Sequence, residues 1–298
     1  MSHLGARLVI ALLWLLHWLP VRVQWAIGAG VGALLHALAG PRRRIARRNL
    51  ELCLPELDAR ARDALVREHF RWLGRSLVER GMLWYAPRER LAQMIEIEGD
   101  VGFAARTEGA VMWLVPHFLA LEIAGLSVLL FQSRPGCDIY QRQSNAVFDA
   151  AISRGRHRFG QSVIVPRKDG IKPLIRAIRD EGRAFFNMPD MDFGRKESAF
   201  VPFFGVPAAT LLAPSRMARM LKMTVQPVVA EMKADGGWRV RFLPPWTDWP
   251  TDDPVADVAR MNAWIESEVR RLPAQYLWVH KRFKTRPLGE QGLYGPRG

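Results

Sequence analysis

Short apolar runs that alternate with longer helical segments constrain the fold of this chain more than any other feature of its sequence. Runs of about four to eight apolar residues predict buried strands, and the longer periodic segments between them predict helices. This alternation favours an α/β domain with a mixed, largely parallel sheet flanked by helices. We expect strands at 110–115, 137–140, 162–165, 184–187 and 224–231, an antiparallel strand at 238–243, and helices at 57–84, 119–130 and 255–272.

A histidine follows the first of these expected strands. Pro116 ends the apolar run, His117 comes next, and Glu122 lies five positions further on, where a helix is expected. Within one helix, a spacing of five separates two side chains by about 140°, so the pair can meet only if His117 lies off the helix. In that arrangement the carboxylate would fix the tautomer of the ring and stabilise its protonated form.

Further polar residues lie close to the ends of the other expected strands. In open α/β sheets, ligands bind at the carboxyl ends of the parallel strands, so these residues are expected to converge with the histidine on one edge. They are Arg142, Arg156, Arg158, Asp190 and Asp192.

The segments that carry these residues occur in a fixed order, at 138–145, 154–160, 187–196 and 200–210, and are followed by a closing segment at 276–287. Together with the His/Glu element they resemble the lipid A biosynthesis acyltransferases of the lauroyl and myristoyl type, which add secondary acyl chains to a lipopolysaccharide precursor. The resemblance runs from about residue 41 to residue 287 and implies a fold like that of the glycerolipid acyltransferases. Glycerolipid acyltransferases more often have an aspartate in this motif, so Glu122 places the chain nearer the lipid A branch.

The activity that the resemblance implies is O-acyl transfer from a thioester to a lipid hydroxyl. His117 is then the expected general base, a role that typically contributes about 10² to 10⁴ in rate, and Glu122 is expected to orient it. Because a thiolate leaves readily and the chain has no Gly-x-Ser-x-Gly motif, we expect direct transfer without a covalent enzyme intermediate. The resemblance further implies acyl carrier protein as the donor, Arg156 as an active-site arginine, and no cofactor beyond the acyl thioester.

The remaining polar residues are expected to bind substrate. Arg142 and Arg158 suit the phosphates of an anionic glycolipid or the phosphopantetheine arm of acyl carrier protein, because the guanidinium fork binds oxyanions in bidentate fashion. The alternative for each is a solvated surface charge. Asp190 and Asp192 would orient an arginine or sugar hydroxyls, or else form a turn that ties loop amides together. The spacing of these two aspartates is also compatible with binding of a divalent cation. No residues in the sequence have the spacing of a zinc site, and no structural metal is expected.

Charge also restricts the partners. A formal net charge of +14 favours an acidic partner, which is a nucleic acid, an anionic membrane or a phosphorylated substrate. Zinc-finger spacing, an RNP-like aromatic strand and a basic region with heptads are all absent from the sequence, which argues against nucleic acid. Cys53 and Cys137 are far apart and form no paired motif, as is typical of a cytoplasmic protein.

The N-terminal residues 1–40 are expected to be a membrane anchor that precedes an acyltransferase domain at 41–298. Two apolar runs, 8–19 and 25–39, are each shorter than the roughly 20 residues that a spanning helix needs. They predict either one bent or tilted anchor or two segments at the membrane interface, with a cleaved secretory signal as a further alternative.

The segment 41–49 contains five arginines directly after the apolar runs. Arginines in this position favour the cytoplasmic side and attract anionic headgroups. We therefore expect the chain at a bacterial inner membrane, with its catalytic domain on the cytoplasmic face.

Two other functions are consistent with the sequence. One is acyl transfer to another lipid acceptor, such as glycerol phosphate, an amino-acid lipid or a glycolipid. The other is a non-enzymatic basic membrane-binding protein in which His117 is incidental. The aromatic residues Phe200, Phe203 and Phe204 are expected either in an acyl-chain channel or in the core. Acyl chain length, the position acylated and oligomeric state are not determined by these patterns.

Overall fold

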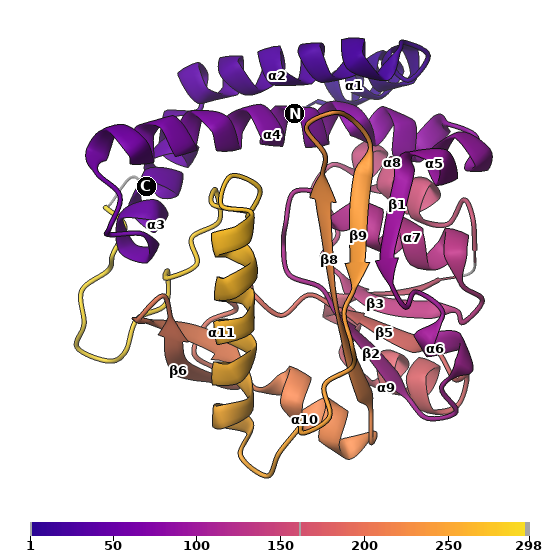
Figure 1. Ribbon diagram of the computed structural model, residues 1–298, viewed down its shortest axis with the longest axis vertical. Helices are drawn as coiled ribbons and strands as arrows, with labels where there is room; N and C mark the ends of the chain where they lie inside the picture. The colour runs from indigo at the N-terminus through magenta and orange to yellow at the C-terminus, as the bar shows by residue number, and fades with distance from the viewer. Residues whose placement is uncertain (1, 161, 296–298) are drawn as a thin grey trace.

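The structure is a computed structural model that describes residues 2–160 and 162–295. Four helices come first in the chain (Figure 1). They are α1 (His3–Leu16), α2 (Val21–Leu38), α3 (Gly40–Cys53) and α4 (Ala59–Tyr85). The long helix α4 lies across one end of the sheet domain, and α1 and α2 lie on its outer side.

A seven-stranded sheet with the order β1-β9-β8-β2-β5-β3-β4 forms the centre of the molecule. The pairs from β8 through β2, β5 and β3 to β4 are parallel, whereas β9 is antiparallel to β8 and parallel to the edge strand β1. The strands are β1 (Ile95–Gly99), β2 (Val111–Leu114), β3 (Gly136–Tyr140), β4 (Val163–Pro166), β5 (Ala184–Asn187), β8 (Thr224–Met232) and β9 (Trp238–Phe242).

The core lies on both faces of this sheet, because alternate residues of a strand point to opposite faces. In β2, Met112 and Leu114 pack into one cluster, which includes α11, and Trp113 packs into the other, which includes α7. The helices around the sheet are α5 (Arg88–Met94), α6 (Phe103–Arg106), α7 (Leu121–Phe131), α8 (Ala146–Arg156), η1 (Arg167–Asp169), α9 (Lys172–Arg179), α10 (Ala213–Met220) and α11 (Pro254–Arg271).

The expected mixed, largely parallel sheet is confirmed, and each of the six expected strands is present with its ends shifted by no more than about one residue. Two parts of the fold were missed. The edge strand β1 alternates Ile and Glu and is short, and the hairpin of β6 (Ser198–Phe203) and β7 (Val206–Leu211) carries a proline in each strand. Proline is depleted in strands and so masks the pattern.

The hairpin turns at Phe204 and Gly205, which both have positive φ angles, as a two-residue hairpin turn requires. Phe203, next to the turn, is fully buried against Tyr276 and Phe283. Phe203 is therefore a core residue, which is the second of the two expectations for these aromatics.

Candidate active site

The histidine and the aspartate of the site lie after neighbouring strands. Strands β2 and β5 pair in parallel, with Leu114 opposite Asn187, so the loops that follow them leave the same edge of the sheet. The first loop carries His117 and the second carries Asp190. The sheet topology thus brings together two residues that are 73 positions apart in the sequence.

Asp190 holds the imidazole of His117. Its Oδ1 lies 2.6 Å from the ring Nδ1, and its Oδ2 accepts a hydrogen bond of 3.0 Å from the backbone N–H of His117. Only 1 % of Asp190 is exposed. Burial alone would raise the pKa of this carboxyl. The neighbouring imidazole and its hydrogen bonds lower the pKa by a larger amount, so the pKa lies below its ordinary value and the group is a carboxylate.

This contact corrects the expectation that Glu122 orients the ring. Because Nδ1 faces Asp190, the other ring nitrogen, Nε2, is directed to the cleft that His117 lines. Among the described residues, Nε2 has no hydrogen-bond partner. An imidazole held in this way can accept a proton from a hydroxyl in the cleft.

Backbone hydrogen bonds hold the histidine loop against residues 275–277, at the start of the closing segment. The N–H of Leu119 donates to the carbonyl of Gln275 at 2.8 Å, and the N–H of Leu277 donates to the carbonyl of His117 at 3.0 Å. Tyr276, between these two contacts, is 3 % exposed. Burial, and then the Asp190 carboxylate beside it, raise the pKa of its phenol well above the ordinary value, so the phenol stays protonated.

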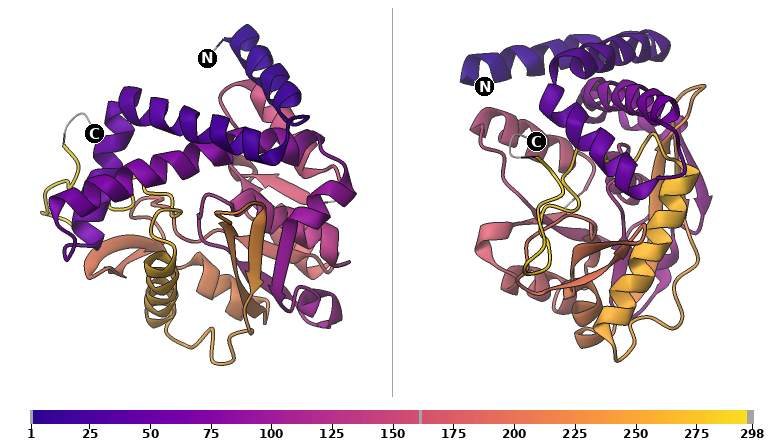
Figure 2. Two further views of the ribbon diagram at one scale, coloured as in Figure 1. Left: turned by 45° about the horizontal axis from the view of Figure 1, so that its top comes forward. Right: turned by 90° about the vertical axis from the view of Figure 1, so that its left-hand side faces the viewer.

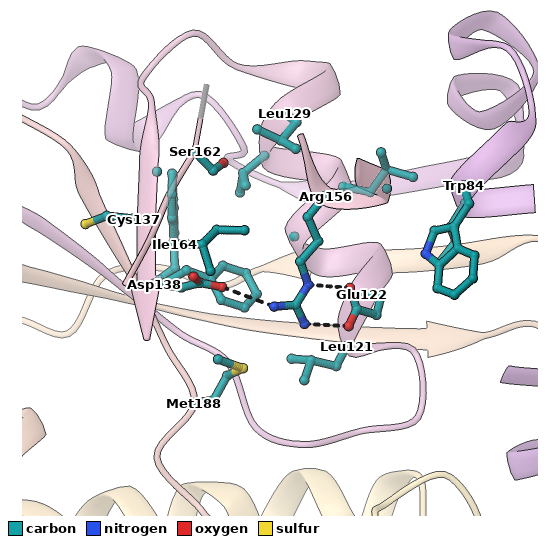
Figure 3. A pocket seen from close by; sticks show the side chains of 18 residues that line it. Trp84, Leu121, Glu122, Leu129, Cys137, Asp138, Arg156, Ser162, Ile164 and Met188 are labelled. Atoms are coloured by element: carbon teal, nitrogen blue, oxygen red, sulfur yellow. Dashed lines mark hydrogen bonds and ion pairs between the residues drawn. The ribbon is translucent and has the colours of Figure 1, made fainter. Parts of the chain in front are cut away.

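Glu122 is bound to Arg156 instead (Figure 3). The guanidinium donates from Nε to Oε2 at 3.1 Å and from Nη2 to Oε1 at 2.6 Å, and its Nη1 lies 3.7 Å from the Oδ2 of Asp138. Glu122 is in the first turn of α7 and Arg156 is the last residue of α8, and each charge is favourable at its end of a helix. Nη1 of Arg80 on α4 lies 4.0 Å from Oε1 of the same Glu122 carboxylate.

The charges in this cluster affect one another. Burial would raise the pKa of Glu122, but Arg156 overcomes this effect and lowers the pKa to about 2. Burial would likewise lower the pKa of Arg156, and Glu122 raises it instead. Asp138 is different, because burial raises its pKa to about 6 despite the nearby guanidinium. The pair of Glu122 and Arg156 therefore stays ionised at any physiological pH.

Two neighbouring hollows share Arg156 in their walls. The first is a cleft of about 440 Å³ that contains His117, and the second is a narrower cavity of about 80 Å³ that enters the protein between α7, β3 and α8. Both are lined by Leu121, Arg156, Phe186 and Met188. The walls of the narrow cavity are mainly apolar and include Trp113, Leu126 and Val128. Trp84, Leu129 and Ile164 line it as well (Figure 3).

Comparison with known proteins identifies the family of this site. A family model described as "Bacterial lipid A biosynthesis acyltransferase" matches residues 1–285. The chain belongs to this family of lipid A acyltransferases.

Its relatives include three named enzymes of Escherichia coli (strain K12). The chain is similar to the lipid A biosynthesis palmitoleoyltransferase, with 37 % identity over 96 % of this chain and 92 % of the relative. It is similar to the lauroyltransferase, with 35 % identity over 96 % of this chain and 93 % of the relative. The identity with the myristoyltransferase is 31 %, over 91 % of this chain and 84 % of the relative.

Two of the residues that were expected to bind substrate hold the acyltransferase fold together. Arg158 donates to the carbonyls of Leu83 and Ala86 at 2.9 Å and 2.8 Å, where α4 ends. Asp192 accepts from the N–H and the hydroxyl of Thr285, both at 2.7 Å, and so ties its loop to the closing segment. The contacts of Asp192 agree with the alternative expectation, a turn that ties loop amides together, because it also accepts from the N–H of Gly194. For Arg158, a role in substrate binding stays a prediction, since these two bonds use only part of its guanidinium.

Arg142 is exposed on the loop after β3, and its role in substrate binding stays a prediction. Asp190 lies in the site, as expected, where it bonds to the histidine.

Sequence reasoning missed Arg80 and Asp138 of the acyltransferase site. An aspartate within a buried strand is unusual unless it is paired, and this signal could have identified Asp138. Arg80 gives no such signal, because it is one of many arginines on α4. No group of three or more His, Cys, Asp or Glu residues able to hold a metal ion occurs in the described part of the chain.

Proposed function

We propose that this lipid A acyltransferase moves a fatty acyl chain from the thioester of acyl carrier protein to a hydroxyl of a lipid A precursor, with His117 as general base. The observation that carries this proposal is the bond between Asp190 and Nδ1, which leaves Nε2 of the histidine free of bonds to the described residues, at a cleft that adjoins an apolar cavity.

In the proposed reaction, Nε2 of His117 takes the proton of the acceptor hydroxyl as its oxygen attacks the thioester carbonyl carbon. The tetrahedral intermediate then expels the thiolate, which takes the proton from the imidazolium. No group on the protein is acylated in this sequence. Asp190 fixes the tautomer and stabilises the transient positive charge on the ring.

Arg156 is proposed to bind the carbonyl end of the acyl group. Its guanidinium lies where the cleft meets the narrow cavity, so a chain that occupies the cavity would present its carbonyl close to this positive charge. The developing oxyanion would be stabilised there. Glu122 acts as a positioning residue in this scheme, because it holds two donors of Arg156.

The charge of the chain supports a phosphorylated acceptor and a donor with a phosphopantetheine arm. Arg142 follows β3 at the exposed side of the site, and Arg167 lines the cleft. Both are proposed to face the phosphates of the glycolipid. The arginine-rich segment at 41–49 supports a location at the cytoplasmic face of the bacterial inner membrane. The acyl chains named for the relatives differ, so no chain length is assigned.

Transfer of a radiolabelled acyl group from acyl carrier protein to a Kdo-bearing lipid A precursor tests the proposal. The wild type, His117→Ala and, as a matched histidine control, His3→Ala on the exposed end of α1 are compared at equal amounts in membranes. We expect transfer by the wild type and the control, and at least about a 10²-fold loss in His117→Ala. Transfer only to another lipid alcohol would refute the proposal that a lipid A precursor is the acceptor. No transfer to any acceptor would favour the non-enzymatic alternative.

A further inference from the structure

The N-terminal helices α1 and α2 form an outer layer on the molecule, with α4 between them and the sheet (Figures 1 and 2). Of the described helices, α2 alone is long and apolar enough to cross a membrane by length and composition. However, the packing of α2 on α4 restricts how α2 can be oriented in a bilayer.

The backbones of α2 and α4 touch at glycines. A Cβ atom added to Gly74 of α4 would lie 2.2 Å from the carbonyl oxygen of Gly28 and 2.3 Å from the nitrogen of Gly32. Trp25 of α2 also stacks on the guanidinium of Arg75, 4.5 Å from the ring centroid. Helix α2 is therefore part of the folded domain, and separating it from α4 would break a close-packed contact.

Helix α1 is held on α4 in the same way, seven residues further along. A Cβ atom added to Gly81 would lie 2.3 Å from the carbonyl oxygen of Leu13. The connection between α1 and α2 is fixed as well, because Arg90 donates to the carbonyl of His17 at 2.9 Å and Gln24 donates to that of Leu19 at 2.9 Å. Both helices are thus attached along α4.

Helix α4 itself cannot enter a bilayer. Its exposed side chains include Arg67, Glu68 and Arg71, and ionised groups are strongly disfavoured in hydrocarbon. If α2 crossed the membrane while packed on α4, these charges would be carried to the same depth. The two helices run side by side (Figures 1 and 2), so α2 must lie in the plane of the membrane surface.

The outer face of this layer has the composition of a membrane-facing surface. Its large apolar side chains are exposed to solvent by up to 74 %, and they are Leu4, Leu8, Leu12, Leu15, Val23, Leu34 and Leu38. Trp14 and Trp18 are exposed near the connection, and Arg7 and Arg22 add positive charge. Tryptophan favours the headgroup level and arginine attracts anionic lipids.

We propose that α1 and α2 form an interfacial platform, which lies in the surface of an anionic bilayer and does not span it. This inference deepens the membrane association in the proposed function. It also places the narrow cavity close to the membrane surface, because Trp84, which lines the cavity, packs with Leu13 of α1, and Asn145, after β3, donates to the carbonyl of Ser2 at 3.5 Å.

Depth measurement by nitroxide labels on α2 tests the platform. Val23→Cys, Gly30→Cys and Leu38→Cys place labels at the start, middle and end of the helix, and Asp252→Cys provides an aqueous reference. Val23 and Leu38 are exposed, a side chain at Gly30 meets no atom within 4 Å, and the native Cys53 and Cys137 are buried. The full chain is bound to vesicles of phosphatidylethanolamine and phosphatidylglycerol, and relaxation by oxygen and by a nickel chelate gives each depth.

The platform predicts the same shallow depth for all three labels, about 5–10 Å into the boundary of headgroups and acyl chains. A spanning helix would instead place position 30 about 15 Å deep and positions 23 and 38 near opposite headgroup layers, which would overturn the inference. Labels as accessible to the nickel chelate as the one at position 252 would also overturn it. Depth is read without an acyl donor, so a failure of acyl transfer would count against the proposed function alone.

Discussion

Replacing Asp190 by asparagine tests which carboxylate acts on the histidine. The variant keeps the size of the side chain but removes the charge that lies 2.6 Å from Nδ1 of His117. An asparagine can also donate to Nδ1, which would put the proton on Nε2 and abolish its role as an acceptor. We therefore expect a lower turnover with little change in KM, because the lost interaction matters when the ring becomes charged.

The expected magnitude follows from the geometry. A hydrogen bond to a charged group contributes about 1.5–3 kcal/mol, and each 1.36 kcal/mol changes a rate tenfold, so turnover should fall roughly 10- to 150-fold. The fall in turnover cannot exceed the fall caused by loss of the base itself, which is about 10²- to 10⁴-fold. Asp190→Asn combined with His117→Ala should be little slower than His117→Ala alone, because the two residues act as a unit.

The assay is acyl transfer under saturating and limiting donor, with the concentration of folded enzyme measured for each variant. Asp192→Asn is the matched control, because Asp192 lies two residues further on and bonds to Thr285 rather than to the histidine. Asp192→Asn should lower the free energy of unfolding, but turnover per folded molecule should stay within about threefold of the wild-type value. This change is well below the loss of turnover expected when a hydrogen bond made in the transition state is removed. Wild-type turnover in Asp190→Asn would refute the reasoning, and so would losses that add in the double variant.

Four further predictions follow from other contacts. Arg156→Lys keeps the charge but cannot bind Glu122 in bidentate fashion, so turnover should fall at least about tenfold in the transfer assay; an unchanged rate would contradict the role of the fork. Gly125→Val places a branched side chain in the narrow cavity, so the ratio of kcat/KM for short over long acyl donors should rise, and an unchanged ratio would exclude this cavity as the acyl site. His69 is fully buried and its pKa is lowered to about 4, chiefly by burial, so the unfolded state binds more protons below about pH 6.5. The free energy of unfolding should therefore fall by up to roughly 3 kcal/mol as the pH drops from 6.5 to 4, and denaturant titrations should show a smaller fall in His69→Gln. Gly74→Ala forces a methyl group against the backbone of α2, so unfolding should become easier by about 1–3 kcal/mol, and a neutral effect would mean that the two helices do not pack as described.

The two acidic residues of the site have different partners. The buried carboxylate of Asp190 serves the histidine, and the carboxylate of Glu122 serves the arginine. In Glu122→Ala the base should remain oriented while Arg156 loses its principal partner, so the effects of Glu122→Ala and Asp190→Asn should be additive. A shared function of both carboxylates on one ring would instead give losses that do not add.

The sequence alone determined the alternation of strands and helices, because the period of apolar residues depends on local geometry. It also placed His117 after a buried strand, and Pro116 marked the end of that strand. These features are local, and the resemblance to the lipid A acyltransferases extended them to a reaction. By contrast, the pairing of His117 with Asp190 depends on the order of strands in the sheet, which no local pattern encodes.

The tertiary structure also carries the proposal for the N-terminal segment, for which the sequence leaves one bent or tilted anchor, two interfacial segments and a cleaved signal as alternatives. The hydropathy of 8–19 and 25–39 is the same whether the helices cross a bilayer or lie on it. The contacts of Gly28 and Gly32 with Gly74, together with the stacking of Trp25 on Arg75, show that α2 is packed along a charged helix. The physical reason is that a sequence specifies which faces are apolar or small, whereas the partner of each face is selected by the packing of the whole chain.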